Sequence, residues 1–124
     1  MERMGDGALG HPDELKIEKE VRDSVAILSL AGAVSVNTYE KLEAALNDLF
    51  DEGKYRIIID MAGVRYVASA GAGVLMNALS QCRENHGNLV LANLSAHVLE
   101  IFDLLNLTHI LPIADSLEAA LNTV

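Results

Sequence analysis

The stretch from residue 60 to residue 75 most constrains what this chain can fold into. It directly follows the unbroken apolar run Ile57-Ile58-Ile59, which predicts a strand buried on both faces at the centre of a sheet. The stretch then passes through a turn predicted at Gly63 and continues as a helix that begins at Ser69. A central buried strand followed by a helix is typical of α/β proteins, in which helices pack on the faces of the sheet.

Apolar periodicity predicts the elements that come before this stretch. Residues 14–20 alternate apolar and polar side chains, which predicts a half-buried edge strand. A tight turn at Arg22-Asp23 and a second strand at residues 25–31 complete a predicted β-hairpin, and Gly32 ends its second strand. Residues 39–50 repeat apolar side chains with a period near 3.6, which predicts a helix closed by Gly53.

The second half of the chain alternates strands and helices. A fourth strand is predicted at residues 88–93, and a short, broken fifth strand at 108–113. Asp115 is predicted to open the last helix through a capping box with Glu118. Ser95 is predicted to cap the helix between these strands, which faces the core through four side chains: Val98, Ile101, Phe102 and Leu105.

These elements follow the order β-β-α-β-α-β-α-β-α and predict an α/β fold. We expect a single mixed sheet of four to five strands with about four helices, because alternating strands and helices imply parallel crossover connections. One domain at residues 14–124 and a flexible tail at residues 1–13 account for the whole chain.

The composition argues against several classes of function. Eighteen acidic and nine basic residues give a net charge of −9, which disfavours binding to nucleic acid and to anionic membranes. No apolar run is long enough to cross a bilayer, and the first residues do not resemble a signal peptide. A single cysteine, Cys82, fits a reducing compartment, and its place on the apolar side of a helical pattern predicts that it is buried. We therefore expect a cytoplasmic protein that does not insert into membranes.

The residues that could support catalysis do not form a recognisable set. Ser69 lies in Ala-Ser-Ala-Gly rather than in the Gly-x-Ser-x-Gly elbow of a hydrolase, and the pair Gly71/Gly73 lacks the lysine of a P-loop. Three of the four histidines lie on different predicted elements at spacings unlike any metal motif, namely His86, His97 and His109, and His11 lacks the partners that a metal site would need. We expect neither an enzyme, nor a metal site, nor a cofactor.

Ser69 is positioned to cap the helix that it opens, by accepting a hydrogen bond from a backbone amide two or three residues later. Its position at a helix start with bare amides also suits an anion such as a phosphate. The residues that follow are all small, which indicates that some group approaches the backbone closely: Ala70, Gly71, Ala72 and Gly73.

The central stretch resembles the signature loop of the STAS domain (sulfate transporter and anti-sigma factor antagonist). The resemblance consists of Asp60 after a strand, the run Val-Arg-Tyr-Val, and the run Ala-Ser-Ala-Gly-Ala-Gly-Val-Leu, and it extends over residues 14–124. In the anti-sigma factor antagonists of this family, the serine at this point is phosphorylated by a partner kinase that is also the anti-sigma factor. The resemblance implies that Ser69 is this phosphorylation site.

The same resemblance implies a binding surface rather than a catalytic one. The unphosphorylated protein would bind the anti-sigma factor/serine kinase, and phosphorylation would release it. The surface is expected to comprise Ser35, Asp60, Arg65, Tyr66, Ala68, Ser69, Ala70, Gly71 and Gly73. The sequence departs from the family pattern at Ala68, where an acidic residue is common, and at Ser35, near which many members carry Asp.

Several alternatives remain open at this point. The domain could be a phosphorylation-independent scaffold subunit of a transport or signalling complex, and it could form a homodimer. Asp60 could be a structural carboxylate bonded to loop amides, and Arg65 and Tyr66 could be ordinary loop residues. A small-molecule site at the strand ends is a third class of function.

Overall fold

The computed structural model describes residues 14–124 and confirms the predicted α/β fold and element order. Five strands form one sheet in the order β1-β2-β3-β4-β5, in which β1 and β2 pair antiparallel and the remaining neighbours pair parallel. The elements are β1 (Leu15–Arg22), β2 (Val25–Val34), α2 (Tyr39–Asp51), β3 (Arg56–Val67), α3 (Ser69–Glu84), β4 (Asn88–Ala92), α4 (Ala96–Leu104), β5 (Ile113–Ala114) and α5 (Leu117–Thr123). The tail expected at residues 1–13 lies outside the described residues.

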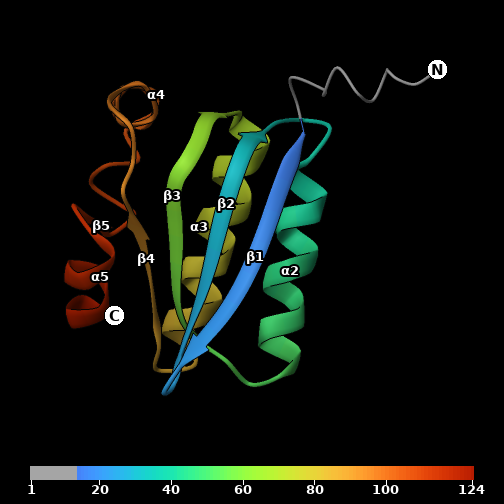
Figure 1. The fold of residues 1–124 in the computed structure, drawn as a ribbon, viewed down its shortest axis with the longest axis vertical. Coiled ribbons are helices and arrows are strands. Elements are labelled where there is room, and N and C mark those ends of the chain that lie inside the picture. Colours follow the sequence, from blue (N-terminus) through green and yellow to red (C-terminus); the bar gives the residue numbers. More distant parts are fainter. Residues whose placement is uncertain (1–13) are drawn as a thin grey trace.

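The sheet separates two apolar layers of unequal size (Figure 1). Helices α2 and α3 lie along one face, whereas α5 packs on the other face beside β4 and β5. Ile57 and Ile59 belong to the larger cluster and Ile58 to the smaller one, because successive side chains of a strand point to opposite faces. All three are fully buried, which confirms that β3 is the central strand.

Strands β2 and β3 run further than the sequence predicts. Gly32 does not end β2, and Gly63 does not form a turn, because both lie inside strands. Two register shifts interrupt the pairing of β2 with β3, and between them Gly32 adopts a φ of +118°, which a side chain rarely tolerates. Pairing resumes beyond the shifts and brings Val34 opposite Val67. The parallel pair therefore carries the chain directly to the start of α3.

The C-terminal elements differ from the prediction in three ways. The fifth strand is only the two residues of β5, because residues 108–111 form turns rather than pairing with β4. Ser116, not Asp115, caps α5 by accepting a hydrogen bond from the amide of Ala119 at 3.0 Å. Leu105, expected to face the core, is exposed at the end of α4.

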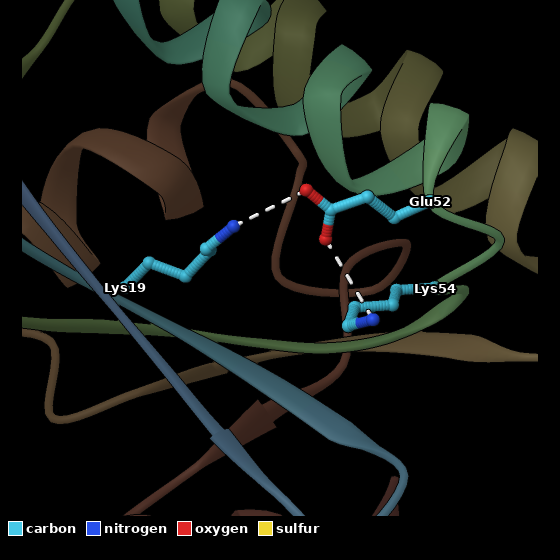
Figure 2. A network of polar contacts seen from close by, with 3 residues as sticks. All are labelled: Lys19, Glu52 and Lys54. Carbon is cyan, nitrogen blue, oxygen red and sulfur yellow. Dashed lines mark hydrogen bonds and ion pairs between the residues drawn. The ribbon is translucent and has the colours of Figure 1, made fainter.

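Exposed polar contacts lie at the end of the sheet where β3 begins. Figure 2 shows Glu52, just after α2, between two lysines. Its carboxylate lies 3.4 Å from the ammonium group of Lys19 and 3.6 Å from that of Lys54. Each such solvent-exposed pair stabilises a protein by about 0–1 kcal/mol. The pair with Lys19 links the end of α2 to β1, and both pairs contribute little to the total stability.

Candidate partner-binding edge of the sheet

The start of α3 is joined to the end of β2 by the backbone of Ala68. The amide of Ala68 donates a hydrogen bond to the carbonyl oxygen of Val34 at 2.7 Å. The carbonyl oxygen of Ala68 accepts the first helical bond, from the amide of Ala72 at 3.0 Å. The amides of residues 69–71 come before this bond, so they have no acceptor within the helix.

Ser69 does not cap α3, contrary to the prediction. Ala68 occupies the N-cap position with an extended backbone, and no side chain accepts a hydrogen bond there. Ser69 is the first residue of the helix and is exposed to solvent. Within residues 14–124 its hydroxyl group forms no hydrogen bond. The hydroxyl is therefore available to another molecule at a helix N-terminus.

The small residues that follow Ser69 have two different environments. Gly71 is buried, and a Cβ atom added to it would lie 2.4 Å from Cγ1 of Val34. The close approach predicted at this point is therefore made by β2 of the same chain. Gly73 is exposed, with no atom within 4 Å of such a Cβ, while Ala70 is half-buried. Of the two glycines, Gly73 is therefore the one that leaves open space over the helix.

Asp60 accepts hydrogen bonds within the chain, as expected if it is a structural carboxylate. Its Oδ1 accepts hydrogen bonds of 3.1 Å from the backbone amide of Ala62 and from the side-chain amide of Asn93. Seven residues separate it from the end of β3, which corresponds to roughly 20 Å along an extended strand. The structure therefore does not bring Asp60 to Ser69. Sequence reasoning missed Asn93, which follows β4 directly.

Ser35 shapes the loop that faces the start of α3. It is only 5% exposed, its hydroxyl accepts a hydrogen bond from the amide of Asn37, and its own amide donates to the hydroxyl of Thr38 at 2.8 Å. It therefore supports the turn between β2 and α2 instead of presenting a surface.

The exposed side chains beside the start of α3 come from the end of β3 and from the loop between β2 and α2. Arg65 and Tyr66 are exposed near the end of β3, as expected for contact residues. Val36, which the sequence analysis did not single out, is 69% exposed directly after Ser35. The sequence could have pointed to Val36, because it is an apolar residue that fits neither the apolar pattern of the strand before it nor that of the helix after it.

The family model of the STAS domain matches residues 16–120 of this chain. The chain belongs to the STAS domain family. BtrV of Bordetella bronchiseptica, whose name describes it as a candidate anti-sigma factor antagonist, is 36% identical over 106 residues. That alignment covers 86% of this STAS domain protein and 91% of BtrV.

Solved structures share the fold of this STAS domain. The crystal structure of an anti-sigma factor antagonist from Mycobacterium paratuberculosis has a TM-score of 0.83 at 22% identity, covering 92% of this chain and 97% of that one. SpoIIAA of Bacillus in its phosphorylated form has a TM-score of 0.66 at 19% identity, covering 90% and 100%. Its unphosphorylated form has a TM-score of 0.68 at 16% identity, covering 87% and 96%.

Membership of the STAS family agrees with the expectation of a binding domain rather than an enzyme. Within residues 14–124, no group of His, Cys, Asp and Glu side chains is arranged to hold a metal ion, and none of the helices could cross a membrane. Cys82 is buried as predicted, and burial raises the pKa of its thiol to about 11. The thiol is therefore protonated near neutral pH and is unreactive.

Proposed function

We propose that this STAS domain acts in the cytoplasm as an anti-sigma factor antagonist-like module regulated by phosphorylation of Ser69. The unphosphorylated form would bind an anti-sigma factor that is also a serine kinase, and phosphorylation would release it. The observation that carries the proposal is the exposed Ser69 hydroxyl, which forms no hydrogen bond within residues 14–124, at the family's phospho-acceptor position. The relatives named as anti-sigma factor antagonists support this role.

A phosphate at this position is compatible with the fold. It adds about −1.5 to −2 charges and three acceptor oxygens, and it would lie at the N-terminus of α3 beside amides that have no helical acceptor. SpoIIAA keeps a similar fold in both forms, since each superimposes on this chain with a comparable TM-score. We therefore expect phosphorylation to change binding and not folding.

A phosphate would disrupt a partner seated on this edge. Val36 and Tyr66 are exposed apolar or aromatic side chains near Ser69, and such residues contribute to binding when a partner excludes water from them. A doubly charged group in the same contact would lose its hydration without a matched counter-charge, which is costly. The same edge would therefore bind in one state only.

The first test is the intact mass of the protein purified from its own organism, with and without phosphatase, followed by peptide mapping. We expect a phosphatase-sensitive phosphate on Ser69. Once its kinase is identified, that partner can be tested for binding to the variants Ser69→Asp and Asn47→Asp. Asn47 is exposed in the second half of α2 and provides a control for added charge. Ser69→Asp should abolish binding and Asn47→Asp should retain it; retained binding by Ser69→Asp would contradict the switch.

A phosphorylation-independent scaffold subunit is the second candidate. Ala68 favours it, because the acidic residue common before the phospho-acceptor is absent. In that case Ser69 would remain unmodified under several growth conditions, and Ser69→Ala would be indistinguishable from wild type in the native host.

A further inference from the structure

Most of the large apolar side chains that this domain exposes belong to one segment of the chain. Among residues 14–124, seven large apolar side chains are exposed, and four of them lie within residues 99–110. Leu104, at the end of α4, is 79% exposed, more than any other of the seven. Leu105 follows it, and Ile110 is exposed in the next turn. Grouped exposed apolar side chains mark interaction sites, whereas isolated ones are ordinary.

A groove lies beside this group. Met76 and Leu79 of α3 and Ile110 line a groove of about 460 Å³, with Ser80, Arg83 and Glu84 on its rim. We call Leu104, Leu105, Ile110 and this groove the α4 surface. The turn that carries Ile110 is anchored by hydrogen bonds of its own backbone, from the amide of Leu107 to Phe102 and from the amide of Ile110 to Leu107. The α4 surface is therefore a formed surface and not a frayed helix end.

Most of the charged residues on and beside the α4 surface are acidic. Residues 84–124 contain five acidic residues and none of the nine lysines and arginines of the chain. Glu100 and Asp103 lie on α4 itself, where they line a second groove with Leu99. The nearest cation in the sequence is Arg83, at the rim beside Glu84. A segment that covers the α4 surface would therefore meet apolar side chains within an acidic field.

We infer that the α4 surface docks a partner protein through an apolar segment flanked by lysine or arginine residues. Opposite charges steer such a segment to the surface and suppress wrong partners. A second copy of this chain fits less well, because it would bring the same acidic residues to the contact. An anionic membrane is disfavoured for the same reason. The inference does not depend on phosphorylation of Ser69.

The test places a photo-crosslinking amino acid at position 104 of the full chain, expressed in its own organism. Val21 provides the control position, because it is exposed on β1. β1 is one edge strand of the sheet, whereas α4 connects β4 to β5 at the opposite edge. We expect a crosslink from position 104, and not from position 21, to one protein, at a peptide that combines apolar residues with Lys or Arg. A crosslink to a second copy, to peptides without basic residues, or to no protein would overturn the inference.

Two substitutions measure the contribution of the surface to binding of that partner. Leu104→Asp should weaken binding of the purified partner by about tenfold or more, as for loss of an anchor side chain, and Val21→Asp should leave it unchanged. Leu104 is exposed, so both variants should unfold at the wild-type temperature, which excludes misfolding as the cause. Equal effects of the two variants on binding would also overturn the inference. Ser69→Asp, tested in parallel, reports on the proposed switch separately.

Discussion

The helices α4 and α5 start differently from α3, although each has a serine at or beside its N-terminus. In α4 the hydroxyl of Ser95 accepts a hydrogen bond from the amide of Val98 at 3.2 Å. In α5 Ser116 does the same for the amide of Ala119. Both serines are N-caps with an extended backbone, so their hydroxyl groups are used to satisfy the helix.

In α3 the serine comes one residue too late to cap. Ala68 holds the N-cap position, and its amide is bonded to the carbonyl oxygen of Val34. Gly71 then packs against Val34, so backbone pairing and close packing fix the start of this helix. The comparison teaches that the Ser69 hydroxyl can be modified without loss of a structural hydrogen bond, whereas modification of Ser95 or Ser116 would break one.

The largest effect is expected where packing replaces the cap. Gly71→Ala should lower the free energy of unfolding by about 1–3 kcal/mol, because the added methyl group would overlap the buried side chain of Val34. Gly73→Ala is the matched control in the same turn of the helix. It should raise stability by about 0.5–1 kcal/mol, because nothing opposes the added Cβ and Ala favours a helix. Urea denaturation of both variants measures the difference, and equal stabilities would contradict the close approach of α3 to β2.

A smaller effect should separate the three serines directly. Ser95→Ala and Ser116→Ala should each lower the free energy of unfolding by about 1 kcal/mol through loss of the cap. Ser69→Ala should change it by less than about 0.5 kcal/mol, as is usual for a surface substitution. Chemical denaturation of the three variants in one buffer makes the comparison. A loss at Ser69 as large as at Ser95 would mean that its hydroxyl is structural after all.

The features that the sequence predicts well are those set by neighbouring residues. The run Ile57-Ile58-Ile59 predicts a central strand because burial on both faces requires consecutive apolar residues. Ser95 is predicted as a cap because an apolar helical period follows it directly. Cys82 is predicted to be buried from its place on the apolar side of α3.

The features that the sequence predicts poorly depend on contacts between distant segments. Gly63 reads as a turn because only the pairing of β3 with β2 shows that it lies inside a strand. The start of α3 is displaced by one residue because the bond from Ala68 to Val34 fixes it. Asp60 bonds Asn93, which lies 33 residues further along the chain. None of these partners can be identified from local pattern alone.

The smallest effect tests whether charge at the start of α3 is tolerated, as a phosphate switch requires. Ser69→Asp should keep the fold and raise the free energy of unfolding by about 0.3–1 kcal/mol at low salt, because a carboxylate interacts favourably with a helix N-terminus. The same interaction depresses the pKa of the new carboxyl in the folded state. The gain should therefore be present at neutral pH and be lost as the pH falls below about 4.

The control is Ser80→Asp, which adds the same charge near the other end of α3 and should show no gain or a small loss. Thermal unfolding at two salt concentrations and two pH values checks this, and a clear loss of stability at Ser69→Asp would mean that phosphorylation disturbs folding as well as binding.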